Sequence, residues 1–250
     1  MCIRDSVIVS QHIHYIPLRK FEDAGVVPHP AYLNMVRHPI NRVQSDYYYL
    51  IDASSRPKGR AEEEIERRRA SRCGCYGLTF SQCVLSVRFE CTENLSLGDE
   101  LLQYFCGDED VCRANTEATY RQARRNLDSY VFVGLTEHFM ISLQVLERLL
   151  PAFFRDARRA FERGAAASAG RGMSVGTATR AKMTAPYEDL SWSAARLLLE
   201  HPQNRWELQL WRDIETRFWQ TVAGCGVVAP AAGGRTMRAR ARRRTLRIRR

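Results

Sequence analysis

The chain has 250 residues, which is enough for one α/β domain with a full hydrophobic core. A hydrophobic content of 45% and an aromatic content of 10% exclude a wholly disordered chain, and no stretch approaches the roughly 18 consecutive apolar residues that a membrane-spanning helix needs. The net charge of +10 is unevenly distributed, because residues 235–250 contain nine Arg and no acid, so that the rest of the chain carries only about +1.

The two ends of the chain differ in composition from its centre. The opening MCIRDS is unlike the apolar run that begins at residue 7, and we expect residues 1–6 to be a non-native leader. Residues 229–250 are Arg-rich and of low complexity, which predicts a disordered tail. We therefore expect one folded domain over residues 7–228.

Strands and helices are expected to alternate along this domain. Apolar runs predict buried strands at residues 7–10, 31–36 and 130–135. Residues 164–184, rich in Gly, Ala, Ser and Thr, predict a loop. The predicted helices cover residues 39–51, 60–69, 116–128, 137–150, 151–163, 188–200 and 205–222. Such alternation indicates the α/β class, with a largely parallel sheet covered by helices on both faces.

Two histidines directly follow the first predicted strand, at His12 and His14. Residues two apart at a strand end point to one side, and ligands gather at the carboxyl ends of parallel strands. An imidazole placed there can remove a proton from a hydroxyl near neutral pH. The alternative is an ordinary surface or core His pair, and metal binding would need a third ligand that the neighbouring sequence does not offer.

The second predicted strand ends in Arg37, and Pro39 then opens a helix that carries Ser45. A helix N-terminus beside an Arg guanidinium favours an anion such as phosphate, and Pro suits the first helical turn. Ser45 lies about two turns along this helix and reaches the same anion only if the anion sits beside the first turns. The alternative is a strand–Arg–Pro–helix junction without a ligand.

Two further basic groups are candidate anion ligands. Lys182 lies with Thr177 and Thr179 in the predicted loop, where hydroxyls and bases either hold a phosphate or face solvent. The run Arg67–Arg68–Arg69 could grip an acidic polymer, but its Glu neighbours favour a helix that neutralises its own charge.

The cysteines favour an oxidising, secretory compartment. Cys83 and Cys91 flank one short loop, Cys106 and Cys112 flank another, and Asn94 opens a glycosylation sequon nearby. Two local disulfides are the interpretation we favour, and reduced structural thiols are the alternative. The cysteine spacing does not fit a zinc site.

In order and spacing these features resemble the uronosyl 2-O-sulfotransferases, which sulfate heparan, dermatan or chondroitin sulfate. The resemblance runs from about residue 11 to residue 222. Its carriers are HxH at 12–14, YLNMVRHPINRVQSDYYY at 32–49, the cysteines at 83, 91, 106 and 112, RNLDSYVFVGLTE at 125–137, LERLLPAFF at 146–154 and the helix at 206–218.

The resemblance implies a P-loop-like sulfotransferase fold and the donor 3′-phosphoadenosine 5′-phosphosulfate, without a metal. Arg37 and Ser45 would hold the 3′-phosphate, and His14 would deprotonate the uronic acid 2-hydroxyl with His12 in support. The segment 177–182 would close over donor and sugar, and Arg67–Arg69 would contact the acceptor polysaccharide. The family disulfides map onto Cys83–Cys91 and Cys106–Cys112.

The chain departs from the family pattern at the donor site. Family members carry a phosphate-cradling loop with an essential Lys upstream of the HxH, but no such loop occurs in the eleven residues before His12. His38 stands where the family usually has Asp after the first phosphate-binding Arg. We therefore expect an inactive fragment of a Golgi enzyme, lumenal and membrane-anchored in its full-length form, which can form homo-oligomers.

Two other function classes are weighed against this one. A sulfotransferase-fold protein could bind acidic glycans without turnover. A basic tail at residues 235–250 could instead bind nucleic acid, but the near-neutral remainder of the chain argues against that partner.

Overall fold

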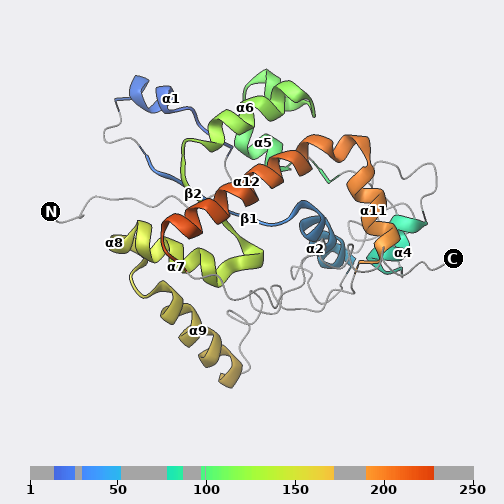
Figure 1. Cartoon of the computed structure of the whole chain (residues 1–250). Coiled ribbons are helices and arrows are strands. Elements are labelled where there is room, and N and C mark those ends of the chain that lie inside the picture. Colours follow the sequence, from blue (N-terminus) through green and yellow to red (C-terminus); the bar gives the residue numbers. More distant parts are fainter. Residues whose placement is uncertain are drawn as a thin grey trace, which may run out of the picture.

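The computed structural model describes residues 14–25, 30–51, 78–86, 97–98, 100–171 and 190–227 (Figure 1). These contain the strands β1 (Tyr32–Val36) and β2 (Tyr130–Leu135). The α-helices are α1 (Leu18–Asp23), α2 (Pro39–Ile51), α4 (Phe80–Leu85), α5 (Glu100–Cys106), α6 (Glu117–Leu127), α7 (Phe139–Leu149), α8 (Pro151–Phe154), α9 (Ala157–Arg171), α11 (Trp192–Glu200) and α12 (Arg205–Gly224). Short 3₁₀ turns are η3 (Asp110–Arg113), η4 (Thr136–His138) and η5 (Pro202–Asn204).

The two strands form a small parallel sheet, so their carboxyl ends meet at one edge. Val36 at the end of β1 is paired with Leu135 at the end of β2. The strands come close at Gly134, where an added Cβ would lie 2.2 Å from the Met35 sulfur. Mixed helix and strand with a parallel sheet is compatible with the predicted α/β class. The predicted strand at 7–10 lies outside the described residues.

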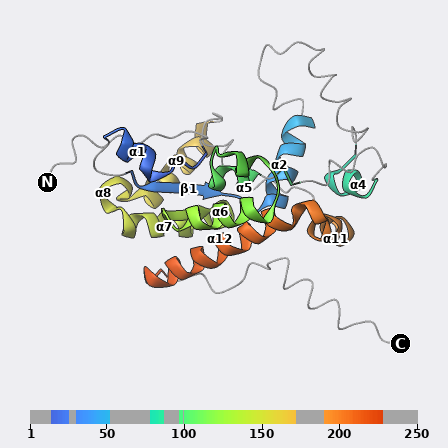
Figure 2. The same cartoon turned by 90° about the horizontal axis from the view of Figure 1, so that it is seen from above.

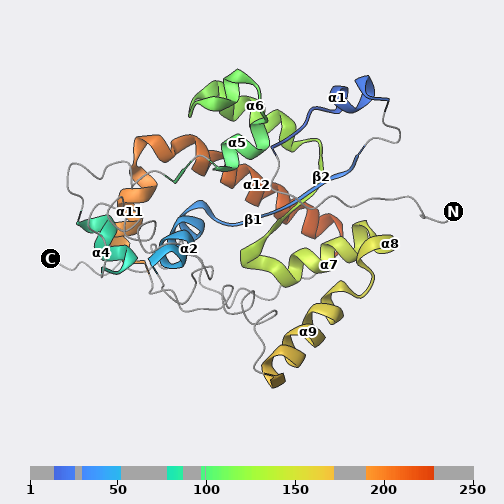
Figure 3. The same ribbon diagram turned by 180° about the vertical axis from the view of Figure 1, so that it is seen from behind.

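The main core forms where α12 crosses one face of the strands (Figures 1 and 2). Leu210, Ile214 and Phe218 of α12 are buried there, and the Phe218 ring lies 6.0 Å from that of Phe132 in β2. A second cluster joins α2, α4 and α11 through buried residues such as Ile40, and it lies beyond the carboxyl ends of the strands (Figure 3). The first turn of α2 therefore sits between two packed units.

Two buried polar residues join η5 and α12 to α5 and to Leu97, which precedes α5. The Glu207 carboxylate is fully buried and accepts the backbone N–H groups of Leu101 and Leu102 at 2.9 and 3.0 Å. Asn204 accepts the Leu97 N–H at 2.9 Å and donates to the Leu198 carbonyl at 2.8 Å. Glu207 thus satisfies donors at the α5 N-terminus that the helix itself leaves unpaired.

The boundary predicted after residue 163 was wrong. The helix from Pro151 was expected to end near Arg163, with a loop from residue 164. Instead α8 ends at Phe154, Asp156 adopts φ +59°, and α9 continues to Arg171. The Ala-rich composition of 165–168 supports this, because Ala has the best helix propensity and outweighs the flanking glycines.

The cysteines are resolved in part. Cys106 and Cys112 form the predicted disulfide, with a Cα–Cα distance of 5.5 Å. Cys83 is disulfide-bonded, and its predicted partner Cys91 lies outside the described residues. Cys225 is a free thiol. In the described part of the chain, no helix combines the length and the apolar character needed to cross a bilayer.

Candidate donor and acceptor sites

Arg37 follows the last residue of β1 and stands at the carboxyl edge of the sheet. Its side chain is half-buried, and among the described residues no carboxylate forms an ion pair with it. The nearby Arg42 differs, since it pairs with Glu100 at 2.8 Å and with Asp46 at 3.1 Å. Of these two described Arg residues, Arg37 is therefore the one available for an external anion.

The first turn of α2 is capped by the side chain of His38. The His38 Nδ1 atom accepts the Ile40 backbone N–H at 3.2 Å, as a side-chain oxygen does at an ordinary N-cap. The ring packs on Trp211, with centroids 5.1 Å apart. Burial lowers the His38 pKa, and the nearby Glu137 carboxylate acts in the opposite direction. The neutral ring is thus the form that caps the helix.

Glu137, which the residue pattern had not singled out, joins β2 to this turn. Its Oε1 atom accepts the His38 backbone N–H at 2.8 Å and the Asn41 side-chain amide at 2.9 Å. The Ile40 N–H donates to His38, and Pro39 has no N–H. Several donors of the first turn are therefore already paired or are missing. The helix N-terminus therefore offers fewer free donors than expected, and an anion would depend more on side chains.

Ser45 lies on α2 two turns after Arg37 and is half-buried. Both residues belong to one β1–α2 unit, which the structure fixes by strand pairing and by the second core cluster. The predicted pair thus shares one local scaffold.

His14 lies at the C-terminal end of α5, where Asp108 and Tyr104 contact it. Its Nδ1 atom lies 2.5 Å from Asp108 Oδ1, and its ring meets Tyr104 edge-on, with centroids 5.1 Å apart. The next residue, Tyr15, packs its ring on Tyr32. Asp108 was not identified from the sequence, because nothing in its spacing links it to a residue 94 positions earlier.

The positions of His14 and Arg37 relative to the sheet differ. Tyr15 and Tyr32 meet at the amino end of β1, whereas Arg37 follows its carboxyl end. The described residues therefore attach His14 and Arg37 to opposite ends of the strand. Other predicted site residues lie outside the described residues: His12, Arg67, Arg68, Arg69, Thr177, Thr179, Lys182 and the sequon at Asn94.

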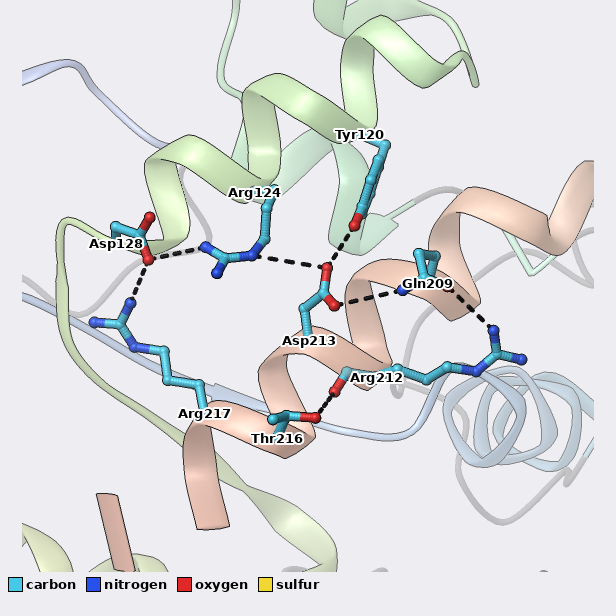
Figure 4. A network of polar contacts seen from close by, with 8 residues as sticks. All are labelled: Tyr120, Arg124, Asp128, Gln209, Arg212, Asp213, Thr216 and Arg217. Carbon is cyan, nitrogen blue, oxygen red and sulfur yellow. Dashed lines mark hydrogen bonds and ion pairs between the residues drawn. The ribbon is translucent and has the colours of Figure 1, made fainter. Parts of the chain in front are cut away.

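A polar cleft of about 480 Å³ lies between α6 and α12 (Figure 4). Asp128 pairs with both Arg124 and Arg217 at 2.9 Å, and Asp213 accepts the Tyr120 hydroxyl at 2.7 Å. These charges neutralise one another. The polar contacts therefore join α6 to α12, and we do not interpret the cleft as an anion site. Within the described part of the chain, no group of three His, Cys, Asp or Glu side chains could hold a metal ion.

Several known proteins are similar to this chain, and their names agree with the resemblance drawn from the motifs. Heparan sulfate 2-O-sulfotransferase 1 of Gallus gallus is 32% identical over 157 residues, which cover 61% of this chain and 40% of that protein. The chain is homologous to 2-O-sulfotransferases. The human protein of that name gives the same identity and coverage. Drosophila melanogaster uronyl 2-sulfotransferase homolog pip is 31% identical over 167 residues, or 63% of this chain and 32% of that protein.

The extent of the match is partial. It spans less than half the length of these 2-O-sulfotransferases. No protein-family model matches the chain.

Proposed function

We propose that this chain is part of an enzyme that transfers a sulfuryl group to the 2-hydroxyl of a uronic acid in a glycosaminoglycan-like polysaccharide. The donor is 3′-phosphoadenosine 5′-phosphosulfate. The homology to heparan sulfate 2-O-sulfotransferases supports the reaction class. The observation that carries the site is Arg37, a half-buried guanidinium without a carboxylate partner among the described residues, at the carboxyl edge of a parallel sheet.

In the proposed site, Arg37 and Ser45 contact the 3′-phosphate of the donor. A guanidinium suits this role because its planar fork of N–H donors matches phosphate oxygens. Thr177, Thr179 and Lys182 remain proposed donor contacts, and Arg67–Arg69 a proposed acceptor contact.

The proposed reaction is an in-line displacement. The 2-hydroxyl oxygen forms a bond to sulfur, the bond from sulfur to the 5′-phosphate oxygen breaks, and its electron pair leaves on that phosphate. The hydroxyl proton passes to a histidine base, proposed to be His14 with His12 beside it. As in phosphoryl transfer, the protein contributes mainly by positioning the reactants and stabilising charge.

The donor site is tested by nucleotide binding to the 250-residue chain, which needs no turnover. We expect adenosine 3′,5′-bisphosphate to bind more tightly than adenosine 5′-monophosphate in calorimetric titrations. Replacing Arg37 by Ala should lower the affinity for the bisphosphate roughly tenfold or more, since a charge-assisted hydrogen bond is lost. The affinity for the monophosphate should be nearly unaffected.

Arg113→Ala is the matched control, because Arg113 is 77% exposed and pairs only weakly, with Asp110 at 3.3 Å. Equal binding of the two nucleotides, or equal losses in the two Arg variants, would refute the proposed 3′-phosphate site.

The second candidate function is binding of acidic glycans without turnover. The attachment of His14 and Arg37 to opposite ends of β1 favours it, since one transfer site needs the base close to the donor sulfate. A transfer assay with desulfated glycosaminoglycan and His14→Ala and His12→Ala variants separates the two. Transfer that depends on either His supports the enzyme, and glycan binding without transfer by the full-length protein supports the binder.

A further inference from the structure

We propose that Asp108 is a positioning residue that holds His14 as the Nδ1–H tautomer and so leaves Nε2 to accept a proton. The inference concerns a contact within this chain. It rests on the proposed function only for the use that the reaction would make of His14.

The first observation is the contact itself. His14 Nδ1 lies 2.5 Å from Asp108 Oδ1. An ionised carboxylate can only accept a hydrogen bond, so the proton in this contact belongs to His14 Nδ1. A neutral imidazole has one N–H, which makes Nε2 the nitrogen with the free lone pair.

The second observation is that Asp108 sits in a turn with several restraints. The Cys106–Cys112 disulfide closes the segment that contains Asp108. The Asn126 side-chain amide donates to the carbonyls of Phe105 and Cys106 at 2.9 and 2.8 Å. These bonds fix the end of α5 directly before Asp108, so the carboxylate is presented by a rigid backbone although its side chain is 65% exposed.

The third observation is the close approach of the histidine segment to this turn. The Tyr15 N–H donates to the Tyr104 carbonyl at 2.8 Å. Gly107 has φ +108°, and a Cβ there would lie 2.8 Å from the Tyr15 carbonyl oxygen. Only glycine fits this backbone-to-backbone contact. The glycine therefore lets the turn come near enough for Asp108 to reach the residue before Tyr15.

The fourth observation is that the ring remains accessible while its plane is restrained. Tyr104 meets the His14 ring at 82°, and the His14 side chain is 36% exposed. A ring held by Asp108 on one side and by Tyr104 at its edge has few orientations, which is what a base that must face a bound hydroxyl requires.

In the proposed reaction this arrangement has a defined use. The acceptor hydroxyl gives its proton to Nε2 as its oxygen bonds to sulfur, and the 5′-phosphate oxygen leaves with the electron pair. His14 is then an imidazolium, and Asp108 stabilises its charge through the Nδ1–H bond, as a carboxylate does beside a histidine base in other enzymes.

The tautomer can be measured on the resting chain by two-dimensional ¹⁵N–¹H NMR with labelled histidine, at a pH where the ring is neutral. The His14 signals are assigned by their loss in His14→Gln. We expect the Nδ1–H form to dominate in the unmodified chain. In Asp108→Ala the ratio of Nδ1–H to Nε2–H should fall roughly fivefold or more, consistent with the loss of one exposed hydrogen bond to a carboxylate.

Asp110→Ala is the matched control. It removes the same charge from the same disulfide loop, but Asp110 is 93% exposed and pairs with Arg113 rather than with a histidine. A dominant Nε2–H form in the unmodified chain would overturn the inference even if a variant failed to fold. An unchanged ratio in Asp108→Ala would do the same.

Because the measurement uses no donor and no acceptor, its outcome is separate from that of the proposed function. A chain that binds no bisphosphate but shows the Nδ1–H form would lose the proposed function and keep the histidine–aspartate pair.

Discussion

The Glu137 carboxylate accepts the His38 backbone N–H at 2.8 Å, and this bond joins the end of β2 to the first turn of α2. Arg37 directly precedes His38 and has no ion pair of its own among the described residues. Its backbone is therefore held by the paired strand before it and by Glu137 after it. An anion site built on Arg37 depends on a residue that comes 100 positions later in the chain.

We expect Glu137→Ala to weaken recognition of a 3′-phosphate without abolishing nucleotide binding. The substitution leaves the His38 N–H and the Asn41 amide without their acceptor, so the Arg37 junction can shift. The ratio of adenosine 3′,5′-bisphosphate to 5′-monophosphate affinity should fall several-fold, on the order of one lost charged hydrogen bond. Calorimetric titration of both nucleotides measures this ratio.

Two variants calibrate that result. Glu137→Gln keeps an acceptor oxygen and should retain most of the ratio. Glu147→Ala removes a carboxylate that accepts a backbone N–H in the same way, from Arg158 at 2.9 Å, on α7 rather than at the strand edge. If Glu147→Ala lowered the ratio as much as Glu137→Ala, general loosening would explain the effect.

We expect His38 to make the chain less stable in mild acid. Burial lowers its pKa below the ordinary value of 6.5, so the folded state binds fewer protons than the unfolded state in this range. Its contribution is complete above pH 6.5 and is lost as the pH falls below that value, because a protonated ring cannot accept the Ile40 N–H. Urea unfolding at about pH 7.5 and about pH 5.5 measures the change.

The control for His38 is His38→Asn, since Asn caps helices well and does not titrate in this range. The variant should lose less free energy of unfolding than the unmodified chain between the two pH values. Identical losses in both proteins would show that other groups carry the acid sensitivity.

The sequence predicted several local elements well, missed the helices α1, α4 and α5, and did not predict the long-range contacts. The helix at 39–51 and the strand at 130–135 were predicted with the observed bounds, because Pro39 marks a helix start and YVFVGL is a continuous apolar run. The contact of Glu137 with His38 could not be predicted, since it depends on which strands pair and in what register.

The candidate site shows the same division. Local residue patterns and motif resemblance pointed to Arg37, Ser45 and His14, and the roles of these residues stay predictions. The placement of His14 beside Asp108 follows from the way α5 ends, at a disulfide turn with a left-handed glycine. Side-chain capping by His38 was also missed, because histidine is not among the residues that usually cap helices.

We expect loss of the Cys106–Cys112 disulfide to destabilise the chain by about 2 kcal/mol, the value that loop-closure entropy gives for so short a loop. Cys106→Ser/Cys112→Ser should lower the free energy of unfolding by this amount in urea. Cys225→Ser, at the free thiol, should have little effect. Equal stability of the two serine variants would contradict the prediction.

The buried Glu207 should contribute more to the free energy of unfolding than the half-buried Glu215 on the same helix. Glu207→Leu would leave the N–H groups of Leu101 and Leu102 buried and unpaired, at a cost of about 1–3 kcal/mol each. Glu207→Gln keeps one acceptor oxygen and should lose less. Urea unfolding of both variants is compared with Glu215→Gln, at a half-buried position two turns further along α12.

Because α5 begins at these two N–H groups and ends at the turn that holds Asp108, Glu207→Leu should also loosen the His14 contact. A stable Glu207→Leu chain with an unchanged His14 tautomer would show that α5 does not depend on this carboxylate.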